Sequence, residues 1–168
     1  ASPKITPVKL STTLGIGIYR QSLNSSTWEK VAMNTPLQDG DAIQTDEYSR
    51  TAIHIGNVSK IWINRSSQLK LHIGGVTALD FTTGIVDIKV NRYPTVFQVN
   101  TPSGVVSVYG TEFQVMVDST QQTIVSCIQD TVYFENAFGK SIVPAGYQSM
   151  AQPKQAPTPP VAVDVAAL

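Results

Sequence analysis

Residues 105–117 read Val105-Val106-Ser107-Val108-Tyr109-Gly110-Thr111-Glu112-Phe113-Gln114-Val115-Met116-Val117. Apolar and polar side chains alternate on both sides of the glycine, which is the period of a strand that has one face in a core. β-Branched residues are frequent in both halves, and they favour strands over helices. The stretch predicts two short strands that meet at Gly110 and Thr111, where the glycine allows a left-handed or bulged backbone.

The same alternation continues through most of residues 37–150. Residues 52–55 and 60–63 have the pattern of a hairpin, and residues 68–73 alternate until a pair of glycines. Further runs of this kind follow, each ended by Gly, Pro, Asn or Asp. The sequence therefore predicts an all-β fold, a β-solenoid-like or β-sandwich stack of about a dozen short strands. One helical turn is expected, around Trp28 in residues 21–36.

Extended arms flank this body at both ends. Residues 1–14 contain two prolines, which forbid a regular helix, and residues 151–168 begin as a proline-rich linker. The second arm ends in three valines at strand spacing, Val161, Val163 and Val165. We expect an extended N-terminal arm over 1–14, an all-β domain over 15–150, and a linker with a strand-like tail over 151–168. Both arms are expected to dock, on their own domain or on a neighbouring subunit.

Charge and cysteine content exclude several classes of protein. Lys+Arg and Asp+Glu each total 12, so the formal net charge is zero, which argues against a nucleic-acid binder or a polybasic membrane-surface protein. No stretch approaches the roughly 20 apolar residues of a membrane span. The lone Cys127 lies in an apolar run and is expected to be a buried structural thiol. The first residues, Ala-Ser-Pro, are typical of the end that a signal peptidase leaves, which predicts export.

Patterns that carry catalysis or metal binding are sparse. His54 and His72 each alternate with apolar residues and are expected on the strand face opposite the core. No nucleophile elbow, phosphate loop or dinucleotide fingerprint occurs, so we expect neither an enzyme nor a cofactor. A glycosidase-type carboxylate pair stays open, because such carboxylates meet in space and not in sequence. A small acidic group lacks the spacing of a calcium loop: Asp39, Asp41, Asp46 and Glu47.

Two further sets of residues have a structural and a functional interpretation. Three N-x-S/T triplets are possible glycosylation sites if the source glycosylates exported proteins, although such triplets also arise by chance: Asn24, Asn57 and Asn64. Scattered aromatic side chains serve either cross-strand packing, which we favour, or a carbohydrate-stacking face: Tyr19, Trp28, Trp62, Tyr93, Tyr109 and Tyr133.

Three blocks of the sequence resemble the FecR-domain family, β-rich modules named after the ferric-citrate regulator. The first is Leu37-Gln38-Asp39-Gly40-Asp41-Ala42-Ile43-Gln44-Thr45, in which Gly40 and Asp41 also predict a turn whose aspartate bonds its own backbone. The second runs from Phe97-Gln98-Val99-Asn100-Thr101-Pro102 to Gly110-Thr111-Glu112-Phe113-Gln114-Val115, and the third pairs Thr131-Val132 with Ala145-Gly146-Tyr147.

The sequence also departs from the family pattern. Asp130 stands where the family usually has glycine before the closing Thr-Val. The regulators of this family carry an anti-sigma segment and a membrane span before the domain, and the 168 residues contain neither. The resemblance therefore implies the fold, and it does not by itself imply control of a sigma factor.

Two functions of different classes follow. The first is a non-enzymatic, exported structural protein that binds copies of itself, as an extracellular filament subunit joined by strand exchange. An open sheet edge accepts such a strand, and the donor side chains would be Val8 and Leu10 or Val161, Val163 and Val165. The alternative is a monomeric periplasmic or cell-surface module of the FecR type that binds or signals to another protein. An enzyme acting on cell-wall polysaccharide is a distant third.

Overall fold

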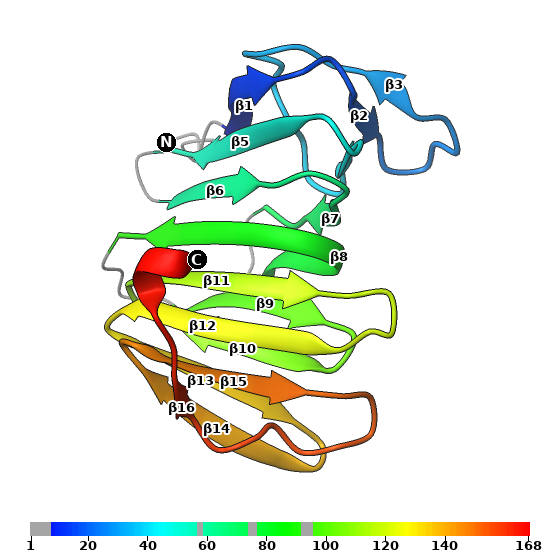
Figure 1. Ribbon diagram of the computed structural model, residues 1–168. Coiled ribbons are helices and arrows are strands. Elements are labelled where there is room, and N and C mark those ends of the chain that lie inside the picture. Colours follow the sequence, from blue (N-terminus) through cyan, green and yellow to red (C-terminus); the bar gives the residue numbers. More distant parts are fainter. Residues whose placement is uncertain (1–7, 57–58, 74–76, 92–95) are drawn as a thin grey trace, which may run out of the picture.

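The computed structural model describes residues 8–56, 59–73, 77–91 and 96–168, and the prediction of an all-β fold is confirmed. Sixteen strands and one short 3₁₀ helix, Val165–Ala167, form within these residues. The strands stack along the molecule in two layers, which we call sheet A and sheet B (Figure 1). This arrangement agrees with the expected stack of short strands.

The two sheets share one strand. Sheet A runs in the order β1 (Val8–Leu14), β5 (Arg50–Ile55), β6 (Ser59–Ile63), the second half of β8 (Thr77–Val90), β11 (Thr111–Val117), β12 (Thr123–Gln129), β15 (Tyr147–Ala151) and β16 (Val161–Ala162). Sheet B runs in the order β3 (Glu29–Lys30), β2 (Ile18–Gln21), β4 (Ala42–Thr45), β7 (Gln68–Leu71), the first half of β8, β9 (Phe97–Thr101), β10 (Gly104–Val108), β13 (Thr131–Asn136) and β14 (Gly139–Pro144).

The crossing from one sheet to the other takes place at Gly84. Before it, β8 pairs with β7 and, in parallel, with β9; after it, the same strand pairs with β6 and β11. Gly84 has φ +108°, and a Cβ atom there would lie 2.5 Å from the Cα atom of Ser67. Only glycine combines this backbone conformation with so close a neighbour.

The core consists of two ladders of apolar side chains that face each other between the sheets. Each ladder crosses several strands in register, and its members have no exposed surface. The ladder of sheet A is Leu10, Ile53, Ile61, Ile88, Phe113 and Cys127, and that of sheet B is Leu71, Leu79, Val99, Val106 and Phe134. The expectation that Cys127 is a buried structural thiol is confirmed, and burial raises the pKa of its thiol to about 11.

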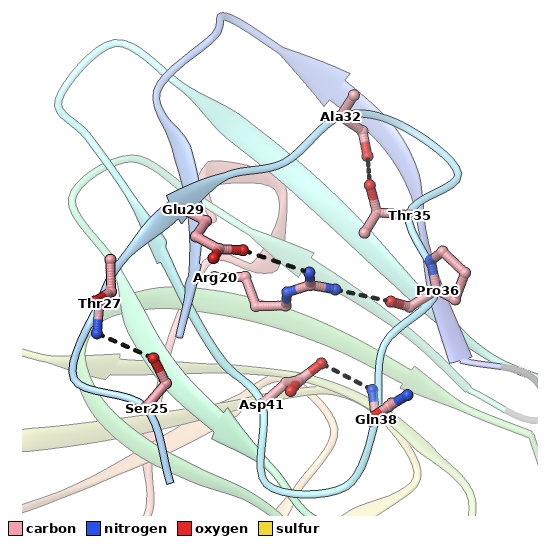
Figure 2. Close-up of polar contacts among 9 residues, drawn as sticks. All are labelled: Arg20, Ser25, Thr27, Glu29, Ala32, Thr35, Pro36, Gln38 and Asp41. Carbon is pink, nitrogen blue, oxygen red and sulfur yellow. Dashed lines mark hydrogen bonds and ion pairs between the residues drawn. The ribbon is translucent and has the colours of Figure 1, made fainter. Parts of the chain in front are cut away.

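The predicted helical turn in residues 21–36 is wrong. Two asparagines in this segment, Asn24 and Asn34, have φ values of 68° and 70°, and no right-handed helix continues through such residues. Side chains bond the backbone locally, as when the amide of Thr27 donates to Ser25 Oγ. Figure 2 shows Arg20 reaching across this segment to the carboxylate of Glu29 and the carbonyl oxygen of Pro36.

Both arms dock on their own domain, as far as the described residues show. In the N-terminal arm, β1 pairs with β5 along the edge of sheet A. In the C-terminal arm, the amide of Thr158 donates to the carbonyl of Met150, and β16 then pairs with β15 over two residue pairs. Pro157 is buried, so the proline-rich segment lies on the domain.

We predict that Gly84→Ala lowers the free energy of unfolding by about 2–4 kcal/mol, because it combines a left-handed backbone with a collision against Ser67. Gly146→Ala is the matched control, since Gly146 has φ +87° and no atom within 4 Å of its missing Cβ. It should cost only about 1 kcal/mol. Chemical denaturation of both variants measures the difference, and equal losses would show that the close approach to Ser67 is unimportant.

Candidate functional site

The outer face of sheet A carries a cross-strand row of polar side chains. Trp62 on β6 pairs with Asp87 on β8, which pairs with Gln114 on β11. The row continues to Ser126 on β12 and Gln148 on β15. Because strand residues alternate between faces, these side chains all point away from the core. Gln114 and Ser126 are nevertheless buried, with 8% and 2% exposure, and the C-terminal 3₁₀ helix contacts β12, whereas Trp62 is 38% exposed.

A groove of about 730 Å³ lies on this face. We call it the Trp62 groove. Its lining residues come from distant parts of the chain: Leu14 and Arg50 at one end, Trp62, Asp87 and Glu112 along the floor, and Ile128, Val165 and Leu168 at the other. The C-terminal 3₁₀ helix contacts β12 and supplies one wall through Val165; Figure 1 shows this helix in red. Apolar and charged side chains of both signs therefore meet in one place.

Trp62 is the large aromatic side chain of this groove. Its side chain is 38% exposed on the outer face, whereas its strand neighbours Ile61 and Ile63 are buried on the inner face. The ammonium group of Lys60 lies 4.9 Å from the centre of its ring, which is a cation–π distance. Tryptophan and arginine are the residue types that contribute most to protein interfaces, and the groove contains both.

Asp87 gives the floor of the groove an unusual carboxylate. Burial raises the pKa of Asp87, and the nearby Glu112 raises it further, while a hydrogen bond from Gln114 opposes the shift. That bond runs from Nε2 of Gln114 to Oδ1 of Asp87 over 3.0 Å. Gln114 is itself only 8% exposed, so its amide is held in place by the sheet. The carboxylate is thus partly desolvated and oriented toward the groove.

Comparison with known proteins places the chain in a family. Residues 41–133, more than half of the chain, match the FecR protein family. The chain belongs to the FecR family. The first and last of the three blocks noted in the sequence extend beyond this match, and the middle block lies inside it.

Solved structures with a similar fold are known. Two crystal structures of a "putative anti-sigma factor" from Parabacteroides distasonis ATCC 8503, at 1.65 and 2.50 Å, each match with a TM-score of 0.65 and 14% sequence identity. Each match covers 73% of this chain and 60% of the other, so the chain spans less than two thirds of those proteins. No curated protein matches. At this identity the likeness concerns the fold.

The turn residues of the FecR blocks lie at strand connections. Gly40 has φ +84°, and the carboxylate of Asp41 accepts the amide of Gln38, as the sequence predicted. Gly110 lies at a bend between β10 and β11 and does not have a positive φ, so the left-handed option is wrong there. A β-bulge follows in the pairing of β11 with β12, and Thr111 is buried with its hydroxyl donating to Thr131.

The side chains predicted to join copies of the chain lie in two different settings. Val8 and Leu10 are buried in the core, with 4% and 0% exposure. Val161 and Val165 are exposed, and Val163 is partly buried beside β15. A role of these residues in assembly stays a prediction.

Other candidate residues are scattered over the surface. Asn24 is exposed, Asn64 is partly buried, and Asn57 lies outside the described residues, as does Tyr93 among the aromatics. Modification of the asparagines stays a prediction. No helix in the described part of the chain has the length and apolar character needed to cross a membrane.

The two histidines point away from the core, as predicted. His54 lies on β5 of sheet A and His72 directly follows β7 of sheet B. His72 lies 2.7 Å from Asp80 on the outer face of sheet B. Burial raises the pKa of Asp80, but hydrogen bonds from His72 and Asn100 outweigh it and leave the pKa below its ordinary value. Across the described segments, His, Cys, Asp and Glu side chains nowhere form a group of three or more that fits a metal ion.

Two carboxylates of the acidic group noted in the sequence accept hydrogen bonds from backbone amides. Asp39 accepts the amide of Ile73, and Asp46 accepts that of Tyr48. These carboxylates hold turns between β4, β5 and β7.

We predict that Asp87→Asn stabilises the folded protein at pH 7. The folded pKa of Asp87 is raised above its unfolded value of 3.8, so the charged form opposes folding. This cost grows as pH rises from 3.8 and is complete above the folded pKa. Below pH 3.8 the two proteins should be equally stable.

Asp118→Asn is the control of opposite sign, because hydrogen bonds from Thr120 and Gln122 lower the pKa of Asp118. It should lose stability at pH 7, with the difference vanishing in acid. Thermal unfolding from pH 3 to 8 tests both variants. A loss of stability in Asp87→Asn at pH 7 would contradict the assigned electrostatics.

Proposed function

We propose that this chain is a non-enzymatic signalling module of the FecR type, which acts on the exported side of a membrane by binding another protein. The observation that carries the proposal is the Trp62 groove in a domain of the FecR family. The likeness of the fold to a "putative anti-sigma factor" supports a regulatory role. The family's regulators place this domain beyond the membrane, which supports an exported location.

The composition of the groove favours a protein as the ligand. A protein interface needs an aromatic or arginine anchor in a partly desolvated pocket, surrounded by a polar rim. Trp62 is such an anchor, and Leu14, Ile128 and Leu168 supply apolar area around it. Lys60 and Glu112 form a rim of mixed charge, which fits a partner segment that carries both signs.

The self-assembling filament has less support. Strand exchange needs an unpaired donor strand, and the described part of the N-terminal arm already pairs with β5 of its own domain. The C-terminal segment likewise follows the edge of β15. A free arm would have to leave these contacts and expose Val8 and Leu10 to water, which is costly for buried side chains. A monomer that binds a different protein requires no such step.

The binding test uses a photo-crosslinking amino acid at Arg50, in the groove, and at Thr82, an exposed residue of β8 on sheet B. We predict a discrete protein adduct from the native cell envelope at the first position and none at the second. Trp62→Ala should reduce the adduct by about tenfold or more, because it removes the aromatic anchor. Equal labelling at both positions, or labelling that Trp62→Ala leaves unchanged, would contradict the groove as the binding surface.

Light scattering on the same protein separates this proposal from the filament. The signalling module is expected as a particle of 18.1 kDa. Polymers that disappear when residues 151–168 are deleted would instead restore strand exchange as the function.

A further inference from the structure

The outer face of sheet B has a different chemistry from the Trp62 groove. Cross-strand pairing aligns Gln98, Ser107 and Tyr133 in one row on β9, β10 and β13. The neighbouring row contains Asn100, Glu135 and Lys140. Val105 also belongs to the second row, and Ile142, which pairs with Tyr133, is 53% exposed. The surface therefore combines amide, hydroxyl and phenol groups with two aliphatic side chains.

Tyr109, directly after β10, lies between two depressions, one on the outer face of sheet B and one beside the ends of β8, β11 and β12 in sheet A. It is 56% exposed and it lines both of them. One depression, of about 550 Å³, is lined by Gln98, Ser107, Tyr133, Glu135 and Lys140. The other, of about 500 Å³, is lined by Lys89, Thr111, Gln129 and Asp130. The phenol ring is thus a ridge with polar side chains on both sides.

Tyr133 supports this ridge on one side. The rings of Tyr109 and Tyr133 meet edge to face, with their centres 6.2 Å apart and their planes at 84°. The ammonium of Lys140 lies 5.5 Å from the centre of the Tyr133 ring. Gln98 donates to Ser107 over 3.3 Å, which orients the amide in the floor of the first depression. Such contacts reduce the entropy that a ligand must remove on binding.

The charges of the two depressions cancel. One contains Glu135 and Lys140, and the other contains Lys89 and Asp130. A strongly charged ligand therefore finds no net opposite charge. The aliphatic side chains in the two linings are Val105 and Val90, so the rings of Tyr109 and Tyr133 are the main apolar surfaces. A neutral ligand rich in hydroxyl groups fits both features, because its hydroxyls bond amides and carboxylates while its C–H faces stack on an aromatic ring.

We propose that this surface binds a neutral oligosaccharide, which stacks on Tyr109 and extends into the depression on either side. The lining residues of these two depressions include neither Trp62 nor Asp87, so the proposal is independent of the groove on sheet A. A glycan site around Tyr109 leaves the Trp62 groove open to a protein partner, because the two sites share no lining residue. The domain then has one face for a polysaccharide and another for signalling.

The test is a titration of the whole chain with neutral linear hexasaccharides of β-1,4-glucose, α-1,4-glucose and β-1,4-N-acetylglucosamine. Binding is followed by calorimetry and by amide chemical shifts. We expect at least one of them to bind and to shift the amides of Tyr109, Tyr133 and Gln98. Tyr109→Ala should weaken binding about tenfold, because the stacking ring is lost, whereas Tyr109→Phe keeps the ring and should retain it.

Two control variants make the outcome specific. Tyr48→Ala removes a tyrosine that is 75% exposed in the turn between β4 and β5, and Trp62→Ala alters only the groove of sheet A. Both should bind the glycan as the native chain does, and circular dichroism verifies that all variants fold.

The proposal fails if no hexasaccharide binds, if Tyr109→Ala binds with unchanged affinity, or if an acidic oligosaccharide of equal length binds more tightly. It also fails if an extended peptide shifts the same amides while the glycans do not. None of these results bears on protein binding at the Trp62 groove, so the two proposals stand or fall separately.

Discussion

The bend of β8 at Gly84 is the constraint on which both sheets depend. One continuous strand is central to sheet B before this residue and central to sheet A after it, so the register of β6, β7, β9 and β11 is set by a single backbone path. Register decides which side chains face outward, since a shift of one residue turns a strand over. Asp80 precedes Gly84 and pairs with Asn100 in sheet B, whereas Asp87 follows Gly84 and pairs with Trp62 in sheet A. The two pairs therefore lie on opposite faces of the molecule.

Alternation was sufficient to predict the fold class, because the buried residues of a strand lie two apart along it, as Ile61 and Ile63 do on β6. It identified the hairpin of Ile53 and Ile61 and the strands around Phe113. It did not predict the first half of β8, where threonines around Leu79 and Phe81 weaken the contrast between the two faces. The switch between sheets was also beyond local sequence, because it depends on pairing with strands that are distant in the chain. The segment around Trp28 was misassigned since left-handed asparagines give no periodic signal.

The sites were harder to predict than the fold. Trp62 and Tyr109 were both singled out as aromatic residues that either pack across strands or bind a ligand, and alternation cannot separate those roles. The two roles differ in the residues that surround the aromatic ring. Trp62 lies beside Asp87, and Tyr109 lies between two polar depressions. These neighbours come from strands that are paired only in the folded protein. By contrast, the departure from the FecR pattern at Asp130 has a local explanation, because its φ of 66° is a conformation that aspartate tolerates where glycine is usual.

The negative charge of Asp87 does not stabilise the fold, and we therefore attribute it to the groove. The other outward residues of its row on β11, β12 and β15 are neutral, and Gln114, Ser126 and Gln148 complete the row with amide and hydroxyl groups alone. An asparagine carbonyl would accept the hydrogen bond from Gln114 equally well, so the sheet gains nothing from a carboxylate that is partly desolvated. A partly desolvated carboxylate next to an exposed tryptophan can serve recognition, because it favours a cationic group on the ligand and disfavours an apolar one. The electrostatics and the exposed aromatic ring are therefore two independent observations that support the proposed protein-binding role of this face.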